Sequence, residues 1–163
     1  MAEENVSPDE AAGRIERAVE ELMELVRSCG DAAWQATSVT EGWTVAALTH
    51  HVADGFALGE DWIERFRGGT DVPGTAATLD AANAEHANTY ARVSREQVIE
   101  LAQPNGAALA ATIRHLGPQE LSSGGAHGPA DGIHLTVADV LGATDRHSRR
   151  HLASAREAIA GAN

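Results

Sequence analysis

Residues 136–159 read TVADVLGATDRHSRRHLASAREAI, and apolar or small residues recur in this stretch at every third or fourth position. Such spacing predicts an amphipathic helix with one face turned toward a core. Thr136 is expected to cap the first turn, and Asp139 would complete a capping box. The predicted inner face consists of Val137, Val140, Leu141, Thr144, Ser148, Leu152, Ala155 and Ile159.

Helix signals of the same kind recur along the rest of the chain. Ser7, Thr44 and Ser94 each precede a periodic apolar stretch as N-caps do, and glycines mark several helix ends. We expect helices over about residues 8–29, 44–67, 76–93 and 94–116, the last kinked or broken at Pro104, then a long irregular loop over residues 117–133. The predicted fold class is all-α, a four-helix bundle with an extra kinked or split helix, in a single domain over residues 1–163.

The overall charge argues against two classes of partner. The chain has 24 acidic and 12 basic residues, a formal net charge of −12, and its basic residues form no long stripe. Such a surface repels phosphate backbones and anionic lipid headgroups. We therefore expect neither nucleic acid nor a membrane as a partner.

Cysteine content and the first residues bear on location. Cys29 is the only cysteine, so neither an internal disulfide nor a cysteine-based zinc cluster can form. The N-terminal stretch MAEENVSPDEAAGRIERA is polar and acidic, unlike a signal peptide, and no apolar run has the length of a membrane span. We expect a cytoplasmic protein.

Two histidines lie one helical turn apart in the final predicted helix. His147 and His151 share a face, His151 near the centre of the apolar stripe and His147 at its edge. Of the adjacent His50 and His51, only His51 lies beside the apolar stripe of its helix, and His50 is expected to face solvent or a partner surface. This pattern predicts a metal site formed by His51, His147 and His151.

Three neutral imidazoles leave at least one coordination position for water or substrate, as in catalytic metal sites. Zn²⁺ is the expected ion, with Ni²⁺ or Fe²⁺ as alternatives, and it would lower the pKa of a bound water or thiol. The competing interpretation is that His147 and His151 only lie on a helix surface and bind no metal, since histidines four residues apart are common on helices.

Four further residues are weaker candidates. Asp54 and Asp145 are placed to orient an imidazole as hydrogen-bond acceptors, or else lie on the surface. His127 and His134, in or beside the glycine-rich segment, either close over the metal or face solvent.

Residues 42–54, GWTVAALTHHVAD, resemble a conserved segment of the DinB-like superfamily and are especially similar to the N-terminal domain of mycothiol-dependent maleylpyruvate isomerases. In that segment the metal-binding histidine follows the tryptophan by eight residues, which is His51 here. Residues 136–152 resemble the family's final helix, whose two histidine ligands correspond to His147 and His151.

The resemblance implies an up-down-down-up four-helix bundle with a metal between helices. It also implies a thiol-dependent transferase or isomerase that acts on a small electrophilic molecule with a low-molecular-weight thiol. The high Ala, Gly and Arg content suggests a GC-rich bacterial genome, for which mycothiol is a reasonable thiol. Because the chain ends at Asn163, just after the last helix, we expect it to lack the C-terminal domain of those isomerases, which argues against maleylpyruvate as the substrate.

Two other functions stay open at this point. One is a non-catalytic, metal-stabilised binding or stress-response module. The other is a bundle that has lost its metal and serves as a dimerisation scaffold, since bundles of this kind often form homodimers.

Overall fold

Long helices account for most of the chain in the computed structural model, which describes residues 6–162. In chain order the elements are α1 (Pro8–Ser28), α2 (Asp31–Trp34), α3 (Val45–Arg67), α4 (Ala76–Thr89), α5 (Arg95–Arg114), α6 (Pro118–Ser122), β1 (Gly124–His127), the 3₁₀ helix η1 (Gly128–Ala130), β2 (Ile133–Thr136) and α7 (Val137–Gly161). None of the helices in this part of the chain combines the length and apolar character needed to cross a membrane.

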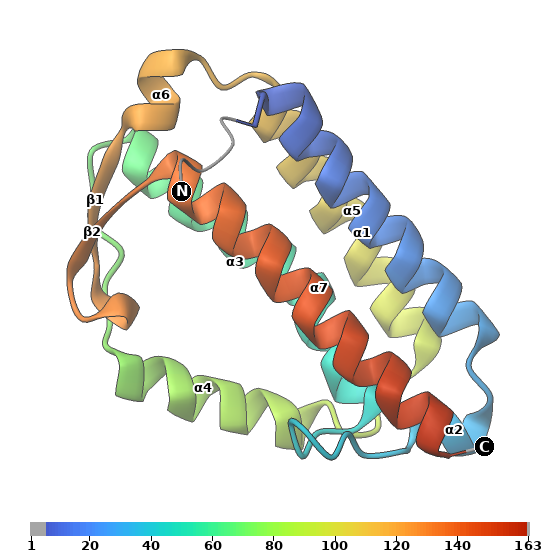
Figure 1. Cartoon of the computed structure of the whole chain (residues 1–163). Coiled ribbons are helices and arrows are strands. Elements are labelled where there is room, and N and C mark those ends of the chain that lie inside the picture. Colours follow the sequence, from blue (N-terminus) through green and yellow to red (C-terminus); the bar gives the residue numbers. More distant parts are fainter. Residues whose placement is uncertain (1–5, 163) are drawn as a thin grey trace.

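Helices α1, α3, α5 and α7 form the four-helix bundle that the sequence predicts (Figure 1). Helices α1 and α7 run in one direction and α3 and α5 in the other, so the up-down-down-up expectation is confirmed. Helix α3 packs against both α5 and α7, and α1 packs against α5. Helices α3 and α5 are parallel because the connection that holds α4 returns the chain to the end of the bundle where α3 began.

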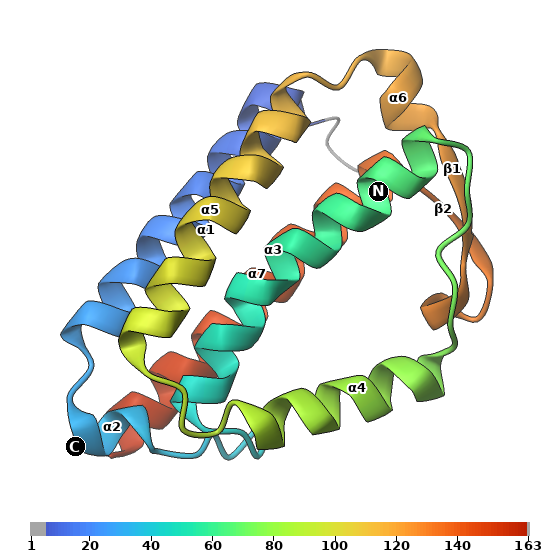
Figure 2. The same ribbon diagram turned by 180° about the vertical axis from the view of Figure 1, so that it is seen from behind.

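The core lies between these four helices, and α4 lies outside it. The largest fully buried side chains come from α1, α3, α5 and α7, and include Ile15, Leu22, Leu48, Phe56, Ile63, Phe66, Leu109, Ile113 and Leu152. Figure 2 shows α4 outside the four-helix bundle, with its end close to the start of α3, and α4 has no buried side chain. This helix ends at Thr89, four residues before the predicted end at Val93.

The predicted helix caps are present, and one of them sets the start of the helix that bears two candidate ligands. Thr136 Oγ1 accepts a hydrogen bond from the Asp139 amide at 3.2 Å, and the Asp139 carboxylate accepts one from the Thr136 amide at 2.8 Å. Ser94 and Gln97 form the same reciprocal pair at the start of α5. Each pair satisfies two backbone donors that the first turn leaves without partners.

Helix α5 runs without interruption through Pro104, so the predicted break there is wrong. A proline inside a helix costs roughly 3 kcal/mol because it removes one hydrogen bond and crowds the preceding turn. Buried residues lie on both sides of it, at Val98 and Ala102 before and Leu109 and Ile113 after. Burial of both halves against the bundle offsets the local cost.

The segment predicted as a long loop over residues 117–133 is largely ordered structure. It contains α6, β1 and η1, and β1 forms an antiparallel hairpin with β2, in which Gly124 pairs with Thr136 and His127 with Ile133. Its glycines permit close packing of backbone on backbone: an added Cβ at Gly124 would collide with the Leu135 carbonyl, and one at Gly128 with the backbone of Gly74. The expectation of an irregular loop is therefore wrong, because these glycines allow close pairing of backbone segments.

Candidate metal centre

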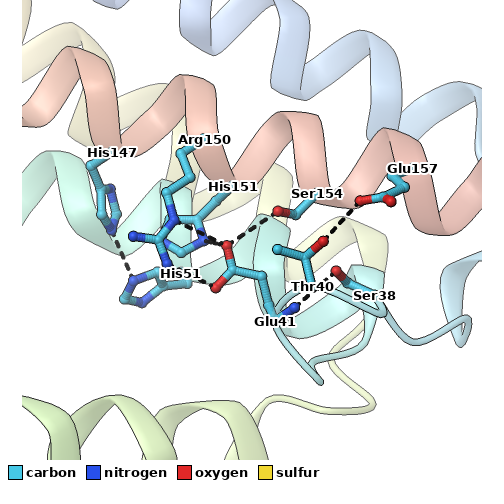
Figure 3. A network of polar contacts seen from close by, with 9 residues as sticks. All are labelled: Ser38, Thr40, Glu41, His51, His147, Arg150, His151, Ser154 and Glu157. Atoms are coloured by element: carbon cyan, nitrogen blue, oxygen red, sulfur yellow. Dashed lines mark hydrogen bonds and ion pairs between the residues drawn. The ribbon is translucent and has the colours of Figure 1, made fainter.

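Three histidine rings from two helices converge between α3 and α7 (Figure 3). His51 comes from the second turn of α3, and His147 and His151 from successive turns of α7. The ring centroids of His51 and His147 are 4.7 Å apart, those of His51 and His151 4.9 Å, and those of His147 and His151 4.6 Å. The structure thus brings together all three residues predicted as ligands, which we call the three-histidine site.

The nitrogens of this site fit a single metal ion. One nitrogen from each ring lies within 4.8 Å of the others, and Nε2 of His51 is 2.9 Å from Nε2 of His147. Zinc–nitrogen bonds of about 2.0–2.1 Å in tetrahedral geometry place ligand nitrogens roughly 3.3 Å apart. That spacing lies between the 2.9 Å of this nitrogen pair and the 4.8 Å that bounds the whole set.

The three imidazoles are held neutral, as metal ligation requires. Burial and the neighbouring histidines lower the pKa of His51 to about 2. Burial, with the neighbouring His151, lowers the pKa of His147 to about 4. Burial also lowers the pKa of His151, although the carboxylate of Glu41 opposes this shift. At neutral pH each ring therefore presents an unprotonated nitrogen to a metal.

Two glycines of α3 make the convergence possible. A Cβ added at Gly55, one turn after His51, would lie 2.9 Å from Cε1 of His147. One added at Gly59 would lie 2.8 Å from Oγ1 of Thr144. Because neither side chain could stay in place beside a methyl group, these glycines set the close approach of α3 to α7.

Glu41, in the segment before α3, contacts the site and was missed by the sequence analysis. Its Oε1 lies 3.2 Å from Nδ1 of His151, which favours the tautomer that leaves Nε2 free for a metal. Its carboxylate also accepts hydrogen bonds from Arg150 at 3.2 Å and from Ser154 at 3.1 Å (Figure 3). Burial alone would raise the pKa of Glu41, but Arg150, His151 and Ser154 together lower it.

The two carboxylates proposed from the sequence as orienting groups do not contact the site. Asp145 accepts a hydrogen bond from Arg149 at 2.7 Å and lies 3.7 Å from Arg14. Asp54 lies 3.9 Å from His86. Glu41 takes the role proposed for them, and since it is more than a hundred positions from His151 in the chain, no local spacing could have indicated it.

The prediction that His50 faces solvent or a partner is wrong, because α4 covers that side of α3. His50 is buried, its Nδ1 lies 3.1 Å from Nε2 of His86, and its ring stacks on Tyr90 at 3.6 Å. The His86 ring also lies 5.0 Å from the His51 ring. A helical wheel of α3 alone could not reveal a cover supplied by a helix some thirty residues later.

Trp43, in the segment that precedes α3, lies against two rings of the three-histidine site. Its ring lies parallel to His151 at 6.1 Å and edge-on to His51 at 5.1 Å. His127 and His134 lie apart from the site. His134 is exposed, one of the two alternatives expected for it, whereas His127 is buried with its ring 4.4 Å from Trp62.

Comparison with known proteins agrees with the fold. The sequence profile of the DinB superfamily matches residues 14–155, a range that includes the whole three-histidine site. YfiT from Bacillus subtilis, described as a probable metal-dependent hydrolase with an unusual four-helix bundle topology, superimposes with a TM-score of 0.77 at 21% identity over 96% of this chain and 90% of that one. An uncharacterised protein from Clostridium difficile 630 gives 0.72 at 16% identity over 96% of both chains. No curated protein matches significantly.

Glu41→Gln is expected to weaken zinc binding by roughly 10- to 100-fold, the usual effect of losing a carboxylate that orients a histidine ligand. Zinc affinity can be measured by competition with a chromophoric chelator. Glu157→Gln is the matched control, because Glu157 is exposed and bonds only Thr40 in the same network. Equal affinities in the two variants would contradict the role of Glu41.

Gly55→Ala is expected to displace the His147 ring and weaken zinc binding by roughly 10- to 100-fold, in line with the usual cost of overpacking. Circular dichroism of the metal-free protein should show an intact helical fold. Gly13→Ala in α1 is the control, because its new methyl group would meet only the tip of Arg17 at 3.4 Å. Unchanged zinc affinity in Gly55→Ala would show that the His147 ring has room to move.

Proposed function

The chain belongs to the DinB superfamily, and from that premise we propose that it is a metal-dependent enzyme for a small electrophilic substrate. In this proposal His51, His147 and His151 bind one divalent ion, with zinc expected first and nickel or iron as alternatives. The nucleophile is a low-molecular-weight thiol, which makes the reaction a transferase or isomerase reaction.

One observation carries this proposal: three neutral imidazoles converge from two helices, and within residues 6–162 no fourth histidine, cysteine or carboxylate joins the set. Structural zinc sites are normally closed by four protein ligands, whereas catalytic sites have three and an open position. A divalent ion held there would act as a Lewis acid and would lower the pKa of a thiol or water at that open position.

The protein's own residues supply positioning around that chemistry. Glu41 holds the His151 ring through the contact at 3.2 Å. Trp43 lies against two of the three rings, where its indole excludes water from one side of the site. Both residues belong to the segment before α3, so this segment serves as the wall of the proposed active site.

The reacting thiol has to come from outside the chain. Cys29 is the only cysteine, it is buried at the end of α1, and burial raises the pKa of its thiol. A buried thiol with a raised pKa is a poor nucleophile. We propose a small diffusible thiol such as mycothiol, which the resemblance to mycothiol-dependent isomerases favours.

Two alternatives follow from specific observations. YfiT, which shares the fold, is described as a probable metal-dependent hydrolase, so water is the alternative nucleophile at the same open position. The three-histidine site also links α3 to α7, so the metal could serve only to stabilise a non-catalytic binding module.

Zinc-loaded protein is expected to accelerate consumption of a thiol by an electrophile panel, measured with cysteine, glutathione and mycothiol. Ester and amide hydrolysis, measured without thiol, tests the hydrolase alternative. His151→Ala is expected to lower the active reaction at least 100-fold, because it removes one of three ligands. His134→Ala, which changes an exposed histidine outside the site, is the control.

Activity that survives His151→Ala would exclude the proposed mechanism. A chelator that lowers the melting temperature sharply, in a protein inactive with every thiol and ester, would favour the non-catalytic module.

A further inference from the structure

Arg150 places an exposed positive charge at the rim of the three-histidine site. It lies on α7 between His147 and His151, and Figure 3 shows its guanidinium beside the imidazoles and against Glu41. The Arg150 side chain is 70% exposed, whereas that of Glu41 is only 8% exposed. In this ion pair the cation therefore faces solvent and the anion is covered.

Glu41 occupies only one edge of the Arg150 guanidinium. Nε of Arg150 donates to Oε1 of Glu41 at 3.3 Å, and Nη2 donates to Oε2 at 3.2 Å. A guanidinium has five N–H donors in a planar fork, so the edge formed by Nη1 and the second hydrogen of Nη2 stays available. The bidentate contact also holds the fork in one orientation, which reduces the entropy lost when a second anion binds.

The neighbouring arginine is directed elsewhere. Arg149 donates to Asp145 at 2.7 Å, on the flank of α7 that faces α1 and Arg14. Arg150 thus differs from Arg149 in its position beside the imidazoles, although the two are adjacent and similarly exposed, at 70% and 64%.

The overall negative charge of the protein makes the exposed cation of Arg150 stand out. The chain has a formal net charge of −12, so most of its surface repels anions. An exposed guanidinium next to a covered carboxylate provides local attraction within that repelling field. A planar anion such as a carboxylate matches the free edge of the guanidinium, which donates two parallel hydrogen bonds to it.

We propose that Arg150 makes the site selective for anionic small molecules, by holding a carboxylate or similar planar anion on its free edge beside the three histidines. As a statement about the substrate this rests on the proposed function. As a statement about binding it concerns Arg150 alone and can be tested without catalysis.

The test compares benzoate with benzamide, which have nearly the same shape and differ in charge. Calorimetric titration gives both dissociation constants for the zinc-loaded and the metal-free protein. We expect benzoate to bind about tenfold more tightly than benzamide, the usual effect of a hydrogen bond to a charged group. Arg150→Ala should remove most of this preference, Arg150→Lys should retain part of it through charge without the fork, and Arg149→Ala should leave it unchanged.

A benzoate preference that persists undiminished in Arg150→Ala would overturn the proposal, as would a wild-type protein that binds benzoate no more tightly than benzamide in both forms. Circular dichroism checks that each variant is folded. A protein that takes up no zinc would refute the proposed function, whereas the ratio of the two dissociation constants in the metal-free protein would still decide the role of Arg150.

Discussion

The close approach of α3 and α7 is the constraint on which the rest of the site depends. At Gly55 and Gly59 a single methyl group would collide with His147 and Thr144 across the interface. Only this spacing brings His51 within reach of a histidine pair on the facing helix, since Nε2 of His51 and Nε2 of His147 are 2.9 Å apart. Larger residues at those positions would push α3 and α7 apart, and the three histidine rings would no longer converge.

The close approach of α3 and α7 also lowers the pKa values of the histidines in the site. Rings buried between helices lose hydration, and a positive charge on one histidine disfavours a second charge on the next, so the pKa of His51 falls to about 2. Grouping buried imidazoles costs stability unless something satisfies their nitrogens. The Glu41 carboxylate lies 3.2 Å from Nδ1 of His151 and offsets part of that cost by its charge, and a divalent ion would bind the converging nitrogens. Residues that lower the stability of a fold in this way are typical of functional sites.

The sequence was sufficient for features that depend on local spacing. The four-residue interval between His147 and His151, the position of His51 beside an apolar stripe, and the Thr136–Asp139 capping box all arise within one helix. The predictions that proved wrong, and the contacts that were not predicted, depend on residues far away in the chain. The contact of Glu41 with His151, the cover of His50 by His86, and the continuity of α5 through Pro104 are decided by tertiary packing. The hairpin of residues 124–136 escaped prediction because its glycines carry no side-chain alternation.

Metal analysis tests the central claim most directly. Protein purified without a histidine tag would be examined by plasma mass spectrometry, with His51→Ala and His147→Ala beside the exposed-residue control His134→Ala. The account predicts about one equivalent of zinc, nickel or iron in the wild type and the control, and loss of that metal in both site variants. A wild type without metal after reconstitution, or a His51→Ala protein that retains the full equivalent, would contradict it.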